Sequence, residues 1–350
     1  MSFSNRLKIT ALPAALMLLL AGSSYAQYTR TDLVTDTGTA SNPADPSLVN
    51  GWGLVSLQTS PWWVSDNGTG KSTLYTGTGA KVPLTVTIPA ANGGQGTPTG
   101  IVGNATSDFV LGAGAARPGK PALFIFATMD GTISGWNGGP EATIEGTSPD
   151  GAVYTGLTIG NNGGANFLFA ADDGPNRKVD VYNASFQLQN WGPDAFVDPN
   201  VPKEFAPYGI QVVTDAQGNE TVWVTYTGLN KAQSGFVAAF TTAGVFKHIE
   251  LRGPLHSPWG VALAPANFGP FSNALLISNN IPRGRIEAFD PNSGAYLGFL
   301  RNASGKSIEI DDIWALQFGH GGGPNGATNQ LFYTGGPDNY GHGVFGVINP

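Results

Sequence analysis

The sequence predicts an all-β protein, a six-bladed β-propeller that an N-terminal strand closes by completing the last blade. The first observation is a short phrase, an aromatic residue or Pro beside Gly, that returns six times at intervals of about fifty residues. The phrases are Gly51-Trp52-Gly53, Pro98-Thr99-Gly100, Tyr154-Thr155-Gly156, Pro207-Tyr208-Gly209, Pro258-Trp259-Gly260 and Ile313-Trp314-Ala315. The second observation is that an apolar strand, a polar loop and further strand-like segments follow each phrase, which is typical of a propeller blade.

Residues 258–300 show the pattern of one blade most clearly. The four strands expected there are residues 258–263, 274–278, 284–289 and 296–300, and the Asp, Asn and Gly residues of 290–294 suit a tight turn between the last two. This unit resembles the NHL type of propeller repeat. The other blades follow more loosely, with strands at 62–65, 72–76 and 84–88 in the first and at 221–225, 235–240 and 245–251 in the fourth.

The sixth repeat is one strand short. Its strands are expected at 313–318, 330–333 and 343–348, after which the chain ends at Pro350. A free strand-like segment, residues 31–35, precedes the first repeat and is predicted to supply the missing outer strand. A ring closed in this way has no long exposed edge.

The repeats fill the chain from about residue 28 onward without a linker, so residues 27–350 are expected to form a single domain. Residues 1–26 are expected to be a signal peptide. Arg6 and Lys8 precede an apolar run over residues 9–21, and Ser24 and Ala26 are the small residues that a signal peptidase recognises. The run is too short to span a membrane, so we expect an exported protein, periplasmic or extracellular, that begins at Gln27.

Charge and cysteine content exclude several classes of function. Without Arg6 and Lys8, 15 of the 17 Lys and Arg residues remain against 24 Asp and Glu, a net charge of −9. Such a surface argues against nucleic acid and anionic membranes as partners. The chain has no Cys, which excludes thiol catalysis and Cys-ligated zinc.

The candidate site residues follow from propeller topology. The loop into each inner strand and the loop between the second and third strands share one face, around the mouth of the central channel, and here these loops are rich in Asp and Asn. The candidate ligand-binding residues are Asp130, Asp172, Asp173, Asp338 and His342. The candidate metal ligands are Asp66, Asn67 and Asn279, because carboxylate and amide oxygens suit a hard cation such as calcium. The alternative is that these residues only form turns.

The motifs of hydrolases are absent apart from one partial resemblance. There is no Gly-x-Ser-x-Gly elbow and no His-x-x-x-His pair, and only His342, beside Asp338, is retained as a site candidate among the histidines. With Asp66 and Asn279 the chain resembles the calcium-dependent sugar lactonases, a group of six-bladed propellers. That resemblance implies a metal held by a Glu near an early inner strand, but residues 50–53 (Asn-Gly-Trp-Gly) contain no Glu.

Aromatic residues recur where inner strands begin, at Trp52, Tyr154, Tyr208 and Trp259. We expect them to pack between neighbouring blades; the alternative is an aromatic platform at the channel mouth for a sugar or another flat ligand.

Three stretches, residues 64–70, 259–269 and 325–333, are similar to a family of uncharacterised exported bacterial propellers, some of which carry a C-terminal PEP-CTERM sorting tail. The resemblance implies the fold but no reaction. Two hypotheses of function remain. The first is a non-catalytic binding or scaffold protein whose partner is a small molecule, an extracellular protein or a glycan. The second is a metal-dependent lactonase or hydrolase with its site at the channel mouth.

Overall fold

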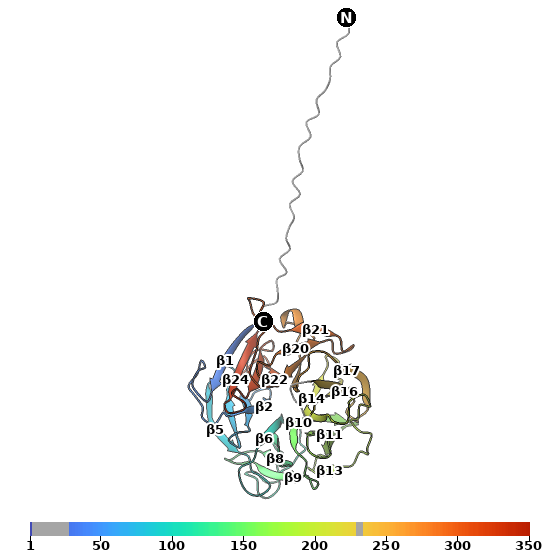
Figure 1. The fold of residues 1–350 in the computed structure, drawn as a ribbon. Coiled ribbons are helices and arrows are strands. Elements are labelled where there is room, and N and C mark those ends of the chain that lie inside the picture. Colours follow the sequence, from blue (N-terminus) through green and yellow to red (C-terminus); the bar gives the residue numbers. More distant parts are fainter. Residues whose placement is uncertain (2–27, 229–233) are drawn as a thin grey trace.

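Six four-stranded antiparallel sheets form a ring in the computed structural model, which describes residues 1, 28–228 and 234–350 (Figure 1). The fold class predicted from the sequence is confirmed. The signal peptide predicted at 1–26 lies, apart from Met1, outside the described residues. The only helical segment described is a short 3-10 turn, Gly269–Phe271. No helix among the described residues is long and apolar enough to cross a membrane.

The strands run from the channel outward in each blade. Blade 1 holds β2 (Gly51–Val55), β3 (Trp62–Asp66), β4 (Lys71–Tyr75) and β5 (Lys81–Thr87); blade 2 holds β6 (Pro98–Gly103), β7 (Phe124–Thr128), β8 (Thr132–Trp136) and β9 (Thr143–Thr147); blade 3 holds β10 (Tyr154–Asn162), β11 (Ala165–Asp172), β12 (Val179–Tyr182) and β13 (Leu188–Gln189). Blade 4 holds β14 (Ala206–Thr214), β15 (Glu220–Thr227), β16 (Gly235–Phe240) and β17 (Phe246–Leu251); blade 5 holds β18 (Pro258–Leu263), β19 (Leu275–Asn279), β20 (Ile286–Phe289) and β21 (Tyr296–Phe299). Each of the six phrases lies at the start of an inner strand, as the repeat predicts.

Blade 6 is closed by the N-terminal strand. Its order is β22 (Ile313–Phe318), β23 (Leu331–Gly335), β24 (Val344–Asn349) and β1 (Thr29–Thr35). β1 runs antiparallel to β24, with Thr29 opposite Asn349 and Thr35 opposite Val344. The predicted closure is therefore confirmed, and the two ends of the ring lie side by side in Figure 1.

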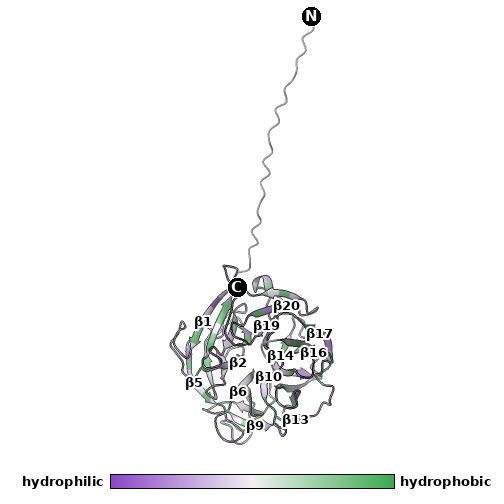
Figure 2. Ribbon diagram, viewed as in Figure 1, coloured by the Kyte–Doolittle hydropathy of each residue, from purple (hydrophilic) through white to green (hydrophobic). Residues whose placement is uncertain are grey.

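The core lies between the blades. The side chains that fill it come from neighbouring sheets; Trp63 of blade 1, for example, stacks on Phe124 of blade 2 with ring centroids 4.1 Å apart. The outermost strands are the least buried. On β17, for example, Lys247 and His248 are exposed and only Leu251 is buried, and Figure 2 shows hydrophilic and hydrophobic residues along the outer strands. Burial therefore falls from the inner strands to the rim of the ring.

Every inner strand is irregular where its phrase lies. The register with the second strand shifts in all six blades, for example between Pro207 and Gly209 in blade 4. The third residue of the phrase then approaches the next blade closely. A Cβ added to Gly209 would collide with the backbone oxygen of Trp259, and one added to Gly260 with that of Trp314. The recurring glycine lets neighbouring inner strands meet.

We expect Gly209→Ala to lower the free energy of unfolding by about 2 kcal/mol, because the new methyl group meets backbone that cannot move aside without shifting a blade. Urea unfolding of the purified protein measures this. The control is Gly322→Ala, since nothing lies within 4 Å of a Cβ at that surface glycine. Equal stability of the two variants would show that the approach of the strands does not require glycine.

Candidate functional site

An aromatic cluster fills the channel. It consists of Trp52, Tyr208, Trp259 and Trp314, the second residues of the phrases in blades 1, 4, 5 and 6, together with Tyr340. The rings of Trp52 and Trp314 stack with centroids 3.7 Å apart, and Trp259 meets Trp314 edge-on at 5.8 Å. Side chains from four blades can meet only on the axis of the ring. Trp52, Tyr208 and Trp314 are buried, so the cluster plugs the channel more than it offers a platform.

The packing predicted from the sequence for these aromatic residues is only partly correct. Trp52, Tyr208 and Trp259 were expected to pack between neighbouring blades, and they meet across the channel instead. Tyr154 does pack between blades 2 and 3, and its hydroxyl contacts Asp180 and Tyr182 at 2.7 Å each. The channel position in blade 3 belongs to the next residue, Thr155, whose carbonyl oxygen accepts a hydrogen bond from Trp259 Nε1 at 2.9 Å.

Asparagine side chains hold the cluster at its rim. Asn50 Oδ1 accepts a hydrogen bond from Trp314 Nε1 at 2.9 Å, and Asn50 Nδ2 donates to Asn67 Oδ1 at 3.2 Å. Asn280 Oδ1 accepts hydrogen bonds from the hydroxyls of Tyr208 and Tyr340 at 3.3 and 3.1 Å. Asn50 has the left-handed conformation, with φ of 49°. These amides orient aromatic rings, which is a structural task.

The buried carboxyl of Asp312 also lies at this end of the channel. Asp312 directly precedes β22, has φ of 47° and is 4% exposed. Burial raises its pKa to about 6, and the charge of Asp311 adds to the effect. Its charge in turn helps to raise the pKa of Tyr340 to about 12, although burial of that phenol is the larger cause. Asp312 is therefore a weaker acid than an ordinary aspartic acid.

The three candidate metal ligands face different surroundings. Asp66, the last residue of β3, is fully buried, and its carboxyl lies beside Thr73 of β4. Burial raises its pKa well above the usual range and favours the uncharged acid. The Asn279 amide is engaged elsewhere: Oδ1 accepts from His256 N at 2.9 Å and Nδ2 donates to Pro254 O at 2.7 Å.

Asn67 is the only one of the three in the channel rim, where its Nδ2 donates to Pro98 O at 3.3 Å. No hydrogen bond joins it to the side chain of Asp66 or Asn279 within the described chain. No group of three or more His, Asp or Glu side chains in residues 28–228 and 234–350 is arranged to hold a metal ion. Calcium binding by Asp66, Asn67 and Asn279 stays a prediction.

Two of the candidate ligand-binding residues stabilise turns. Asp172 Oδ1 accepts hydrogen bonds from the backbone N–H groups of Val153 and Gly174, each at 2.8 Å. Asp130 Oδ2 accepts one from Ala91 N at 2.7 Å. Asp173, the next residue after β11, is half-buried. The carboxyls of Asp172 and Asp130 therefore bond to backbone groups of the surrounding loops, and ligand binding by these residues stays a prediction.

Asp338 and His342 do come together, with 3.8 Å between Asp338 Oδ2 and His342 Nε2. The stronger partner of His342 is one the sequence did not indicate, Asp36, which follows β1. Its Oδ2 is 2.7 Å from His342 Nδ1, and Asp36 raises the pKa of the imidazole. This pair joins the end of β1 to the loop before β24, so it belongs to the ring closure.

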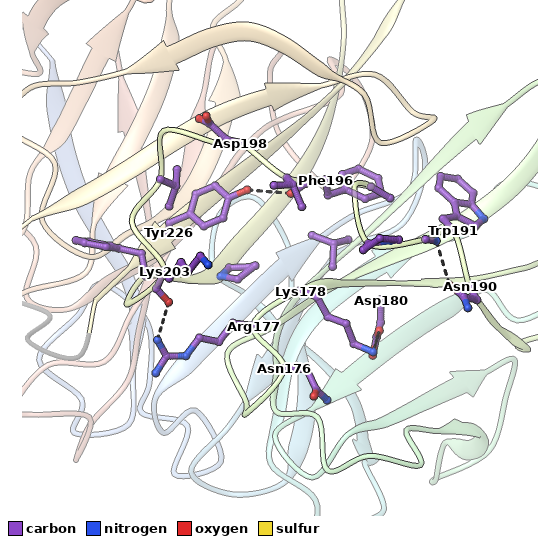
Figure 3. A pocket seen from close by; sticks show the side chains of 18 of the residues that line it. Asn176, Arg177, Lys178, Asp180, Asn190, Trp191, Phe196, Asp198, Lys203 and Tyr226 are labelled. Atoms are coloured by element: carbon purple, nitrogen blue, oxygen red, sulfur yellow. Dashed lines mark hydrogen bonds and ion pairs between the residues drawn. The ribbon is translucent and has the colours of Figure 1, made fainter.

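A cavity lies between blades 3 and 4, away from the channel. It has a volume of about 780 Å³ and is drawn in Figure 3. We call it the interblade pocket. Its lining comes from the loop before β12, from β12 and β13, from the long loop 190–205, and from β14 and β15. The residues that matter below are Arg177, Lys178, Asp180, Trp191, Phe196, Val197, Asp198, Lys203, Phe205 and Tyr226.

The apolar walls of the interblade pocket are rings held by packing. Trp191 lies nearly parallel to Phe196, with centroids 6.1 Å apart and planes at 15°. Phe205 meets Phe236 edge-on at 4.7 Å. The hydroxyl of Tyr226 donates to the backbone oxygen of Phe196 at 3.4 Å. The walls are thus ordered by contacts within the protein itself.

The polar side of the interblade pocket contains one network and two other cations. Lys178 Nζ forms ion pairs with Asp180 at 3.0 Å and with Asp150 at 3.1 Å. Arg177 Nη1 donates to the backbone oxygen of Lys203 at 3.0 Å, which brings Arg177 beside the loop that carries Lys203. Figure 3 shows Arg177 and Lys203 at one end of the view and Trp191 at the other, with Tyr226 and Phe196 between.

The repeat in the sequence gives no indication of this pocket. Loop 190–205 connects blade 3 to blade 4, and such connections differ in length from blade to blade, so the repeat does not place it. A signal was present nevertheless. The segment has Trp191, Phe196 and Phe205 where connections are usually polar, and aromatic residues in a long loop indicate that the loop packs on something.

Comparisons with known proteins support the fold and do not indicate a function. No family profile matches the chain. An uncharacterised protein of Acanthamoeba polyphaga mimivirus is 28% identical over 301 residues, covering 81% of this chain and 77% of the viral protein. A second uncharacterised protein of the same virus is 27% identical over 335 residues, covering 90% of this chain and 78% of its own length. Both relatives are themselves uncharacterised.

Two solved structures share the architecture. A catalytically inactive virginiamycin B lyase of Staphylococcus aureus with quinupristin aligns with a TM-score of 0.53 and 13% identity, covering 93% of this chain and 99% of the lyase. A gluconolactonase of Xanthomonas campestris aligns with a TM-score of 0.53 and 13% identity, covering 87% and 86%. At such identities the likeness shows the propeller fold alone.

Proposed function

We propose that the protein is an exported, non-catalytic binding protein that takes a small organic molecule into the interblade pocket. The observation that carries the proposal is the pocket itself. Its volume of about 780 Å³ lies within the range of about 300–1,000 Å³ found for ligand sites. Ordered aromatic walls with a few polar groups at one side are the lining that such sites have.

The channel mouth is a less suitable ligand site than the interblade pocket. Its aromatic side chains pack on one another, and its amides are occupied in orienting them. Of the residues expected to hold a metal for lactone hydrolysis, Asp66 is fully buried and the amide of Asn279 is bonded to backbone groups. No observation in the described chain therefore favours the hydrolase over a binding protein.

The test uses a neutral aromatic probe, N-phenyl-1-naphthylamine, whose fluorescence rises when it leaves water. We expect the chain from Gln27 onward to bind one molecule of probe per chain, and Trp191→Ala to weaken binding at least about tenfold, because one wall of the pocket is removed. Trp136→Ala is the matched control, a half-buried Trp on blade 2 outside the pocket. Thermal melting establishes that each variant is folded.

A second variant covers the case in which Trp191→Ala unfolds. Val197 lines the pocket and is 48% exposed, so Val197→Asp places a charge beside the probe without disturbing the core. If Val197→Asp bound the probe as tightly as the wild type, the probe site would not be the interblade pocket. Turnover of any member of a lactone and ester panel by the wild type would overturn the non-catalytic part of the proposal.

A further inference from the structure

The charges around the interblade pocket are unusual for this protein. The chain has 17 Lys and Arg residues against 24 Asp and Glu, yet three of the cations, Arg177, Lys178 and Lys203, line one cavity. Lys178 is neutralised by Asp150 and Asp180. Arg177 and Lys203 form no ion pair within the described residues. Two positive groups are therefore left to attract an anion.

The acids of the lining do not cancel this charge. Asp180 already has two partners, because its Oδ1 pairs with Lys178 and its Oδ2 accepts a hydrogen bond from the Tyr154 hydroxyl at 2.7 Å. Asp198 is 5% exposed, its Oδ1 accepts from Asn200 N at 2.9 Å, and burial raises the pKa of its carboxyl. The carboxylate of Asp180 is thus paired with Lys178, and burial favours the uncharged form of Asp198.

The guanidinium of Arg177 is also held in a position where it can bind an anionic group. One N–H of its guanidinium donates to the backbone oxygen of Lys203, which fixes the group next to the Lys203 segment. A guanidinium has five N–H donors, so several remain for an oxyanion. Planar guanidinium groups match carboxylate, sulfonate and phosphate oxygens well. Beside them the aromatic walls offer an apolar surface to the rest of the ligand.

We propose that the interblade pocket selects organic anions, in which an acidic group meets Arg177 and Lys203 while an aromatic or apolar body lies against the Trp191 side of the pocket. This inference rests on the proposed function, since it specifies the class of molecule that the same pocket takes. It adds a requirement that the pocket volume alone does not impose, a negative charge at one end of the ligand.

The experiment compares two probes that differ only in that charge. 1-Anilinonaphthalene-8-sulfonate has the same ring system as N-phenyl-1-naphthylamine and adds one sulfonate. We expect the wild type to bind the sulfonate about tenfold more tightly than the neutral probe at low salt. The preference should shrink as NaCl rises to about 0.5 M, because salt screens partly exposed charges.

The variant that tests the residues is Arg177→Gln with Lys203→Gln. We expect the preference for the sulfonate to fall to about twofold or less while the affinity for the neutral probe stays within about twofold of the wild type. The control is Lys120→Gln with Lys306→Gln, which removes the same net charge at two exposed positions on other blades. This control should keep the wild-type preference.

The outcomes separate the two proposals. If the wild type binds both probes equally, the selection of anions is wrong and the binding pocket stands. If the control pair lowers the preference as much as the pocket pair does, the effect comes from net charge and the assignment of Arg177 and Lys203 is wrong. If neither probe binds to the wild type, both proposals fall.

Discussion

A chain that begins after residue 36 should lose most of its stability, because it lacks the strand that completes blade 6. β1 pairs with β24 along its length and buries Leu33 and Val34 in the cluster shared with blade 1. Two such side chains contribute about 3–6 kcal/mol, before any loss of ladder hydrogen bonds is counted. Domains of ordinary stability have about 5–15 kcal/mol in total.

The measurement is thermal and urea unfolding of the chain from residue 37 beside the chain from Gln27. The control that starts at Gln27 removes only the expected signal peptide. A synthetic peptide of residues 27–42 added to the shortened chain should raise its melting temperature in a concentration-dependent way, since it binds the folded ring alone. Identical unfolding of the two chains would mean that β1 is not needed to close the ring.

Trp314→Ala should be the most damaging single substitution in the channel, with a loss of about 3–5 kcal/mol in the free energy of unfolding. Trp314 is 1% exposed and contacts the rings of Trp52, Trp259, Tyr208 and Tyr340. Its removal leaves a cavity on the axis and deprives Asn50 Oδ1 of the hydrogen bond from the indole.

Urea unfolding measures the effect, with Trp191→Ala as the comparison. Trp191 is half-buried at the edge of the interblade pocket, so its truncation should cost less than Trp314→Ala. A loss below about 1 kcal/mol for Trp314→Ala would show that the rings repack around the gap and that the cluster does not hold the blades together.

The blades could be predicted from the sequence because each is specified locally, by alternating strands and by one phrase. The closure followed from counting strands. The direction of the aromatic side chains did not follow, because it depends on the shift of register within each phrase: Tyr154 and Thr155 are adjacent, and the shift between Tyr154 and Gly156 decides which of them faces the channel.

The hydrogen-bond partners of the Asp and Asn residues could not be predicted from the sequence, for a different reason. An Asp or Asn at a strand end is free to bind a ligand only if nearby backbone groups do not already form hydrogen bonds with its side chain. Those backbone groups belong to other loops, so the local sequence does not show them. Asn279 is an example, since its amide bonds to His256 and Pro254, which precede the inner strand of its blade. The interblade pocket depends on loop 190–205, which no repeat places.

The pairing of β1 with β24 also has a consequence for the order in which the molecule assembles. Arg30 and Tyr333, which are 303 positions apart, share a hydrogen bond in the closed ring. Contacts between such distant segments form late, because the entropy of closing a long loop must first be overcome. Until the last strand of the chain is available, both the first strand and the edge of blade 6 are open to pairing with other molecules. The partly assembled ring is therefore the form of this protein that is most prone to pair with other molecules.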